Sequence, residues 1–499
     1  MNASADKQPS AGSKASGIRI WGLAAAVAAL VIVMILPSTP SLPVAGQYML
    51  GVLAFAVILW MTEAVDYAVS SLLIAALMAF LLGLAPNPAK PDTLLGTSAA
   101  LTIALGGFAN TALALVAAAL FLSAAMQITG LDRRIALVVL SRMGARTNRV
   151  VIGAILTGVV MAFFVPSTTA RVACLVPITL GMIQAFGVGR QSRFAALLMI
   201  VTAQTASIWN VGIKTASAQN LVMVGFAEKM LNGTVTWLEW LVVAAPWAIL
   251  MSIALYFIMM RMLPPEAKEI AGGKAAVEAE LKKLGPITPA EIKLMVISIV
   301  LLFLWATEKI VHPFDSSSTT VAAIALMFMP GIGIMDWKTA QAKIPWGTIL
   351  LFGVGISLGT ALLQTKAAGW LAAIVVSGLG LQQATAFMVL TVLSVFLIVI
   401  HLGFASATAL ASAIIPIVIS VLQQVKTPGI NVLGMTLLLQ FVVSFGFILP
   451  VNAPQNMVAY GTDTFTSKDF IRTGLVITAV GFVLLLVLSV TYWHWIGYV

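Results

Sequence analysis

Long apolar runs separated by short polar segments dominate this chain. Nine of them reach about 20 residues, the length at which an apolar helix spans the hydrocarbon core of a bilayer. These runs lie near residues 18–36, 45–62, 67–85, 101–126, 239–262, 292–311, 319–335, 346–364 and 470–496. The pattern predicts a polytopic membrane protein in which each of these runs forms one spanning helix.

Four further apolar stretches are interrupted near their middle by small, polar or helix-breaking residues. Non-helical backbone at membrane depth is stable only where it is buried in protein or lines a wet cavity. We therefore expect 150–185 and 384–423 to form re-entrant helical hairpins. We expect 194–226 and 431–461 to form spanning helices that are unwound in the middle. The predicted fold is all-α, with about eleven spans and two re-entrant hairpins.

The interruptions contain the same short motifs twice. PSTTARVACLVPI at 166–178 and ASATALASAIIPI at 405–417 share Ser-x-Thr-Ala and a later Pro-Ile. Downstream, Gln219-Asn220 recurs as Gln455-Asn456 at nearly the same distance from the serine. Internal repeats with polar breaks at matching positions are the best sequence pointer to a transporter site at the bilayer midplane. We expect two inverted repeats, since each holds an odd number of spans.

Composition and charge narrow the class of protein. Hydrophobic residues make up 61% of the chain and charged residues 9%, against about a quarter charged in soluble proteins. Threading the predicted spans places most of the 27 Lys and Arg residues on the side of the N-terminus, which the positive-inside rule assigns to the cytoplasm. The net charge of +10 therefore reflects topology and not a nucleic-acid partner. We expect an integral protein of a bacterial inner membrane.

Other function classes find little support. The single cysteine, Cys174, excludes an intramolecular disulfide, and three widely separated histidines do not suggest a zinc site. The sequence has neither an HExxH motif nor paired intramembrane aspartates, so we do not expect an enzyme. A channel remains a remote alternative, because it would need a continuous polar pathway through the membrane.

The repeats suggest a division of the chain into six parts. They are 1–17 (disordered cytoplasmic tail), 18–147 (scaffold helices of repeat 1), 148–262 (hairpin, broken helix and following helix of repeat 1, in the transport domain), 263–290 (cytoplasmic linker), 291–380 (scaffold helices of repeat 2) and 381–499 (hairpin, broken helix and last helix of repeat 2, in the transport domain). Residues 131–146 read as an amphipathic helix on the cytoplasmic interface. Residues 366–377 hold the equivalent place on the opposite face.

At these motifs the chain resembles the divalent anion:sodium symporter family, the INDY-type citrate/dicarboxylate carriers. The matching stretches are WMTEAVDYAVSSLLIAAL (60–77), LGGFANTALALVAAAL (105–120), LDRRIA (131–136), VPSTTARVACLVPI (165–178), SAQNLV (217–222), PWGTILLFGVGISLGTAL (345–362), FASATALASAIIPI (404–417) and LPVNAPQNMVAYG (449–461). The resemblance implies a homodimer in which a transport domain moves against a fixed scaffold, in the manner of an elevator. It also implies a small anionic substrate.

The family signature at each hairpin tip is Ser-Asn-Thr, and this chain departs from it twice. Thr168 and Ala407 stand where the family has asparagine. The resemblance assigns the tip asparagines to sodium coordination, so their loss favours sodium-independent exchange. Arg171, in Ser-x-Thr-Ala-Arg, and His401, in His-x-x-Phe-Ala-Ser, resemble the exchanger branch of the family. We therefore predict no cofactor and no metal site, with sodium disfavoured as a coupled ion.

The candidate substrate-binding residues lie at the tips and breaks. They are Ser167, Thr168, Thr169, Asn220, Ser406, Ala407, Thr408, Asn456, Lys214, Arg171 and His401. Helices that begin at such tips present free N–H groups and a positive dipole end, which together bind anions. The alternatives are hydroxyls that bond back to helical carbonyls and asparagines that only cap the broken helices.

Three ionisable residues fall at membrane depth, where charge is costly and often functional. We expect Lys214 to take the place of a sodium ion or to pair with a substrate carboxylate; the alternative is snorkelling to an interface. Arg171 is a candidate for a second carboxylate, or else a structural residue. His401 is a candidate titratable group, or else a hydrogen-bonded structural histidine. The expected function is exchange of di- or tricarboxylates, with a sodium- or proton-coupled carboxylate or sulfate symporter as the alternative.

Overall fold

The computed structural model describes residues 11–499 except 38, 88–89, 144–145, 186 and 267–272, and the described chain is almost entirely helical. The helices before residue 285 are α1 (Ala11–Ile35), α2 (Val44–Thr62), α3 (Tyr67–Gly83), α4 (Thr97–Leu105), η1 (Gly106–Phe108), α5 (Thr111–Thr129), α6 (Leu131–Ser141), α7 (Thr147–Phe164), α8 (Thr168–Ala185), α9 (Arg193–Gly212), η2 (Lys214–Ala216), α10 (Ala218–Leu231), α11 (Trp237–Met262) and α12 (Gly273–Lys283). The later helices are α13 (Pro289–Ala306), α14 (Ser316–Phe328), α15 (Trp337–Gln341), α16 (Trp346–Gln364), α17 (Ala367–Gly378), α18 (Ala386–His401), α19 (Ala407–Gln424), α20 (Val432–Val443), η3 (Pro450–Asn452), α21 (Pro454–Tyr460), α22 (Ser467–Val490) and α23 (Tyr492–Trp495). Strands β1 (Pro86–Asn87) and β2 (Lys90–Leu94) pair antiparallel.

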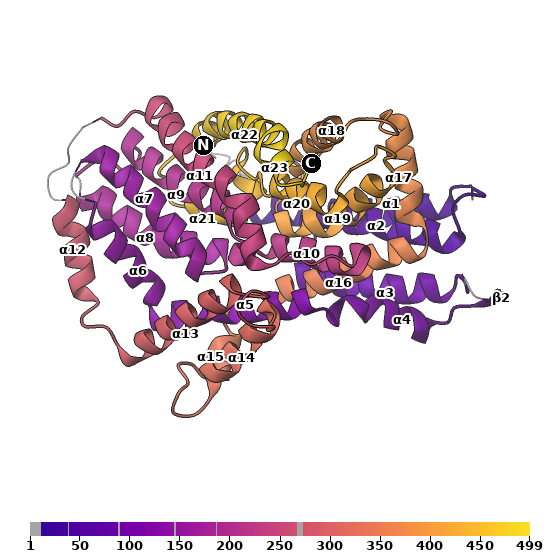
Figure 1. Cartoon of the computed structure of the whole chain (residues 1–499), viewed down its shortest axis with the longest axis horizontal. Helices are drawn as coiled ribbons and strands as arrows, with labels where there is room; N and C mark the ends of the chain where they lie inside the picture. The colour runs from indigo at the N-terminus through magenta and orange to yellow at the C-terminus, as the bar shows by residue number, and fades with distance from the viewer. Residues whose placement is uncertain (1–10, 38, 88–89, 144–145, 186, 267–272) are drawn as a thin grey trace, which may run out of the picture.

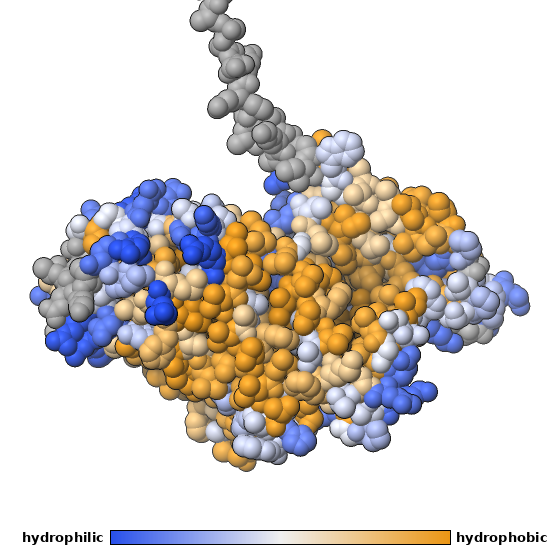
Figure 2. Space-filling view, turned by 90° about the horizontal axis from the view of Figure 1, so that it is seen from above, coloured by the Kyte–Doolittle hydropathy of each residue, from blue (hydrophilic) through white to orange (hydrophobic). Residues whose placement is uncertain are grey.

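The surface is arranged as a membrane protein requires. Among the described residues, nine helices are long and apolar enough to cross a bilayer. Figure 2 shows a broad apolar band across the middle of the molecule and polar side chains gathered at both ends of the long axis. The predicted all-α polytopic membrane fold is confirmed.

The two ends of the molecule hold different elements. Figure 1 shows α6 and α12 at one end of the long axis, with α17 and the β1–β2 hairpin at the other. The predicted interfacial segments 131–146 and 366–377 thus form short helices, α6 and α17, at opposite ends. Of the expected linker 263–290, the structure describes α12 and its flanks, while residues 267–272 lie outside the described part.

Several element bounds differ from the sequence prediction. The predicted span 101–126 is broken into α4 and α5, because Asn110 caps α5 by accepting hydrogen bonds from Ala112 N (2.8 Å) and Leu113 N (3.4 Å). Gly107 sits at the break, where an added Cβ would lie 2.1 Å from the carbonyl oxygen of Gly353 in α16. Close approach of two backbones, which the sequence did not reveal, therefore ends α4.

Two smaller differences concern helix ends. The run 319–335 yields only α14, which ends at Phe328. The predicted tail 1–17 overlaps α1, which begins at Ala11; residues 1–10 lie outside the described part of the chain.

Both predicted hairpins and both unwound helices are present as helix pairs with breaks. The helices α7 and α8 meet at 165–167, and α18 and α19 meet at 402–406. The helix α9 is separated from α10 at 213–217, and α20 from α21 at 444–453. The elements pack crosswise, because α8 from the first half contacts α21 and α19 from the second half contacts α10. The tips and breaks of both halves therefore surround one region.

Side chains satisfy the backbone groups that each break exposes. The amide of Asn220 donates to the carbonyls of Asn210 (2.6 Å) and Ile213 (3.1 Å), and Trp240 Nε1 donates to Val211 O at 2.8 Å. These bonds stabilise the first break, since an unpaired buried carbonyl costs about 1–3 kcal/mol.

The second break is held in the same way. Asn456 Nδ2 donates to Gly446 O at 2.8 Å, and Gln204 Nε2 donates to Phe447 O at 3.0 Å. Equivalent asparagines therefore play equivalent capping parts at both breaks.

Candidate functional site

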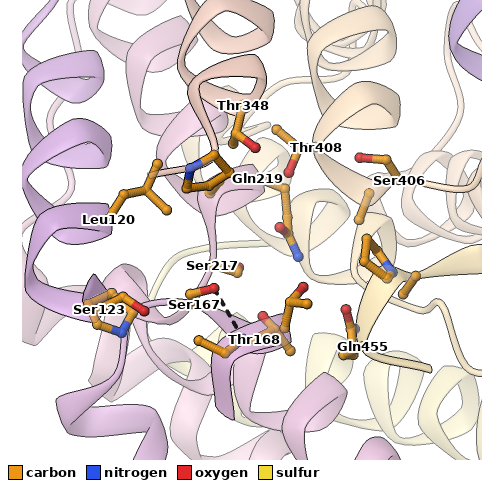
Figure 3. A pocket seen from close by; sticks show the side chains of 18 of the residues that line it. Leu120, Ser123, Ser167, Thr168, Ser217, Gln219, Thr348, Ser406, Thr408 and Gln455 are labelled. Atoms are coloured by element: carbon orange, nitrogen blue, oxygen red, sulfur yellow. Dashed lines mark hydrogen bonds between the residues drawn. The ribbon is translucent and has the colours of Figure 1, made fainter. Parts of the chain in front are cut away.

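A cavity of about 470 Å³ lies where the two hairpin tips and the two helix breaks meet. Figure 3 shows that hydroxyl and amide side chains from these elements point into it. The polar lining residues are Tyr67, Ser123, Gln127, Ser167, Thr168, Thr169, Asn210, Ser217, Gln219, Lys343, Thr348, Ser406, Thr408 and Gln455. No Asp or Glu is among the described residues that line the cavity. The site therefore offers many donors and no formal negative charge.

The two tip serines have the same local structure. Ser167 Oγ accepts a hydrogen bond from Ala170 N at 3.4 Å, drawn as the dashed line in Figure 3, and Ser406 Oγ accepts one from Ala409 N at 3.3 Å. Each serine therefore caps the helix that begins at its tip. A capping hydroxyl accepts from the helix and keeps its own proton, which it can donate to a ligand. Two serine-capped helix starts, α8 and α19, face one cavity.

The neighbouring threonines differ between positions. Thr169 and Thr408 line the cavity, and neither hydroxyl has a protein hydrogen-bond partner among the described residues. The Thr168 hydroxyl instead donates to Asn210 Oδ1 at 2.6 Å. The hydroxyls of Thr169 and Thr408 can therefore donate to a ligand, whereas the Thr168 hydroxyl already donates to Asn210. Ala407 lines the cavity and adds only a methyl group.

Arg171 lies behind the first tip and not in the cavity. Its guanidinium is completely buried and donates to the carbonyls of Val165 (2.9 Å), Ala216 (3.1 Å) and Ala206 (3.3 Å). It also donates to Asn210 Oδ1 at 2.7 Å. The structure therefore does not bring Arg171 to the cavity lining: the side chain is a cation among neutral oxygens that joins the tip to the break.

Lys214 also lies outside the cavity lining. The ammonium is buried and donates to Val235 O at 2.6 Å, beyond the end of α10. The acidic groups whose charges act on it are Glu228, Glu239 and Glu308, none of which lines the cavity. The Lys214 ammonium therefore lies outside the cavity lining, and the cation next to the first tip is Arg171.

The remaining candidates take structural positions. His401 is buried beside the second tip, with Nε2 at 3.4 Å from Asn452 O. Asn220 and Asn456 are completely buried behind the cavity wall as caps of the broken helices. Of the predicted site residues, the structure brings Ser167, Thr168, Thr169, Ser406, Ala407 and Thr408 together around the cavity.

Sequence reasoning missed several lining residues. Gln219 and Gln455 belong to the duplicated Gln-Asn motif, so the repeat could have identified them. Lys343 and Thr348 come from the segment that begins α16, where no repeated pattern marked them. Asn210 precedes the first break and becomes significant only through its bonds to Thr168 and Arg171.

The architecture and sequence have known counterparts. The model of the family described as "Sodium:sulfate symporter transmembrane region" matches residues 18–499. The chain belongs to this family. A "Membrane protein" of Cupriavidus necator is 55% identical over 480 residues, covering 96% of this chain and 93% of that protein.

Two relatives with functional names are more distant. The "Sodium-dependent dicarboxylate transporter SdcS" of Staphylococcus saprophyticus is 24% identical over 86% of this chain and 82% of its own. The "L-tartrate/succinate antiporter" of Escherichia coli is 26% identical over 80% of this chain and 81% of its own. The sodium:sulfate symporter family thus includes carboxylate and sulfate transporters, and the chain is a membrane transporter and not an enzyme.

One solved structure supports the fold alone. The YdaH transporter of Alcanivorax borkumensis superposes with a TM-score of 0.57 at 16% identity, covering 85% of this chain and 97% of that one. Because the identity is so low, the similarity between the two structures concerns the fold and says nothing about the substrate of this chain.

Proposed function

We propose that the protein is a secondary active transporter that exchanges di- or tricarboxylate anions across the membrane without sodium. The observation that carries the proposal is the pair of serine-capped helix starts that face one cavity. Two positive helix ends and unpaired hydroxyls suit a substrate with a carboxylate at each end. The names of the dicarboxylate transporter and the tartrate/succinate antiporter among its relatives support this substrate class.

The environment of Arg171 supports independence from sodium. A sodium ion in a protein needs neutral or negative oxygen ligands that converge on one point. At the first tip the carbonyls of Val165, Ala206 and Ala216 already accept from the guanidinium. A second cation a few ångströms from this one would be repelled in a medium of low dielectric constant.

The second tip also supports independence from sodium, and here the donor is an uncharged amide. The amide of Asn452 donates to the carbonyls of His401 (2.8 Å) and Phe404 (3.0 Å). Phe404 occupies the place in the second motif that Val165 occupies in the first. The chain's own N–H groups therefore bind the tip carbonyls in both halves.

Sodium-coupled symport is the second candidate. It is favoured by Asn220 Oδ1 and Asn456 Oδ1, two buried oxygens for which no hydrogen-bond donor is found among the described residues. Such oxygens are potential cation ligands, and one relative is named for sodium dependence. Sodium would then be a transported co-substrate and not a resident metal.

Counterflow in proteoliposomes separates the two candidates. The purified protein is placed in vesicles that are empty or loaded with unlabelled succinate, and uptake of labelled succinate is followed with sodium or potassium outside. Exchange predicts uptake that needs the internal dicarboxylate and is equal in both salts. Strong sodium-driven uptake into empty vesicles would instead establish the symporter.

The transport mechanism forms part of the same proposal. We assign residues 148–262 and 381–499 to a moving transport domain, because they hold both hairpins and both broken helices. Residues 18–147 and 291–380 form the scaffold, and the two halves are inverted repeats in each protomer of a homodimer. The host membrane is a bacterial inner membrane, with the N-terminus in the cytoplasm and lipid around the apolar band. The arrangement can be tested with the variant Lys343→Cys in a background that lacks Cys174. A membrane-impermeant thiol reagent is applied from each side of the membrane, with and without substrate, and the labelling of position 343 is measured.

A further inference from the structure

The side-chain amide of Gln455 is one of the polar groups that line the cavity. Gln455 lies in the first turn of α21 and lines the cavity. Its Nε2 donates to Ser207 Oγ, in α9, at 3.1 Å. Figure 3 shows the oxygen of this amide on the side of the cavity.

The bond to Ser207 decides the orientation of the amide. Side-chain O and N atoms of glutamine are normally assigned from the hydrogen-bond network. The Ser207 hydroxyl donates its single proton to the carbonyl of Ala203 at 3.2 Å. With that proton on the Ala203 carbonyl, the Ser207 oxygen accepts from Gln455, which assigns the NH₂ group to the atom of Gln455 that faces it. The carbonyl oxygen Oε1 is the part of the amide left for the cavity.

Oε1 is then an acceptor without a partner. No hydrogen-bond donor to it is found among the described residues, and the atom is not one of the fully buried unpaired oxygens. A carboxylate has no proton to give it, and two oxygens in contact repel each other. A hydroxyl group has the required proton, because it can donate to Oε1 while its own oxygen accepts elsewhere.

We propose that Gln455 is a specificity-determining residue that binds a hydroxyl group of the substrate, so the preferred substrates are hydroxylated dicarboxylates. This assignment rests on the proposed carboxylate transport. The two carboxylates occupy the serine-capped helix starts, and the carbon chain between them passes Gln455. A cavity of about 470 Å³ falls in the range that holds drug-sized ligands, so a substituted four-carbon chain fits.

Gln219 occupies the matching place in the first half, with a difference that makes the inference specific to Gln455. Its Nε2 lies 3.4 Å from Ser444 Oγ, near the limit for a hydrogen bond. No donation by Ser444 to a carbonyl fixes the orientation of that amide. Of these two matching glutamines, Gln455 is therefore the one whose amide oxygen is assigned to the cavity side.

The test compares succinate with malate, which differ by one hydroxyl group and carry the same charge. Competition against labelled succinate exchange in vesicles loaded with succinate gives the half-inhibiting concentration of each acid, with both enantiomers of malate measured. For the better enantiomer we expect a preference over succinate of about threefold to tenfold, which is the range for one neutral hydrogen bond. In Gln455→Met, which removes the acceptor at similar volume, the preference should fall to about one.

Two further variants complete the design. Gln440→Met is the matched control, since Gln440 is a buried glutamine in α20 that does not line the cavity, and it should keep the wild-type preference. Ser207→Ala removes the partner that orients Gln455 and should lower the preference at least twofold even if Gln455→Met does not fold.

Equal binding of malate and succinate by the wild type overturns the assignment, as does an unchanged preference in Gln455→Met and Ser207→Ala. Absence of any dicarboxylate counterflow in the wild type is a different result, because it overturns the proposed function and with it this assignment.

Discussion

Arg171 and Asn210 are joined by a hydrogen bond of 2.7 Å from Nη2 to Oδ1. Because arginine has only donors, this bond fixes the oxygen of Asn210 toward the guanidinium and leaves its NH₂ group free to face the cavity. Thr168 donates to the same oxygen at 2.6 Å. A buried cation that does not itself line the cavity thus orients two residues that do.

The first prediction concerns this cation. Arg171→Ala should lower the thermal midpoint in detergent and weaken anion binding. It removes the arginine donor of the carbonyls of Val165 and Ala216, which lie outside the helices, and each unpaired buried carbonyl costs about 1–3 kcal/mol. If those oxygens then admit sodium, the variant should be stabilised by sodium more than by potassium, since a ligand that binds the native state raises its stability.

A thermal-shift series in sodium, potassium and choline chloride measures this effect, with the wild type as the reference. A wild type that sodium stabilises specifically, or an Arg171→Ala variant that binds anions as tightly as the wild type, would contradict the role given to the guanidinium.

The second prediction concerns the tip serines. Ser167→Ala and Ser406→Ala should each weaken substrate binding by a few-fold to tenfold, the range for one neutral hydrogen bond. Loss of the cap should also cost about 1 kcal/mol of stability. Ser420→Ala is the matched control, because Ser420 lies in α19, the helix that Ser406 caps, but bonds back to Pro416 O at 2.9 Å and does not line the cavity. Anion titrations that show the control and the tip variants to be equally affected would place the site elsewhere.

Much of this arrangement could be predicted from the sequence, for a physical reason. The Ser-x-Thr-Ala motif recurs in two apolar runs at matching positions, and such matched polar breaks point to a transporter site, so Ser167 and Ser406 marked both tips. The break between α4 and α5 escaped prediction, although Asn110 supplies the cap of α5. The close approach of Gly107 to Gly353 that accompanies this break arises from packing, which the sequence does not show.

The direction of side chains could not be predicted. In the sequence, Arg171 lies just after the first tip and Lys214 lies at the first helix break. These positions give the depth of each residue in the membrane but not the side toward which its long side chain turns. Lys214 extends to Val235 O, whereas Arg171 turns back to Val165 O and Ala216 O. The sequence named both cations as candidates for the site, and in the structure neither of them is among the described residues that line the cavity.

The third prediction separates these two cations. Lys214→Met should leave anion affinity within about twofold of the wild type, because the ammonium does not line the cavity and its one hydrogen bond goes to Val235. Measured in the same assay, Arg171→Met should weaken binding more strongly, since it releases both Thr168 and Asn210. The reverse order of effects would restore Lys214 as the group that neutralises the substrate.

The last prediction concerns the end of the molecule that holds α6. Arg134, in α6, donates to Glu291 Oε1 at 2.6 Å and to Oε2 at 3.2 Å. Glu291 also accepts from Thr288 N at 2.7 Å as part of the box that caps α13. The pair is largely buried, with side chains only 14% and 4% exposed. Arg134→Met should therefore destabilise the protein by about 3–5 kcal/mol, because it leaves a buried carboxylate without its partner.

The exposed pair Arg133–Glu280 links α6 to the neighbouring helix α12 and serves as the control. Its side chains are 49% and 33% exposed, so Arg133→Met should cost at most about 1 kcal/mol. A double-mutant cycle of Arg134→Met and Glu291→Gln, read from thermal midpoints in detergent, isolates the coupling between the two side chains. Equal losses in Arg134→Met and Arg133→Met, with no coupling in the cycle, would mean that packing of α6, and not this ion pair, holds it against α13.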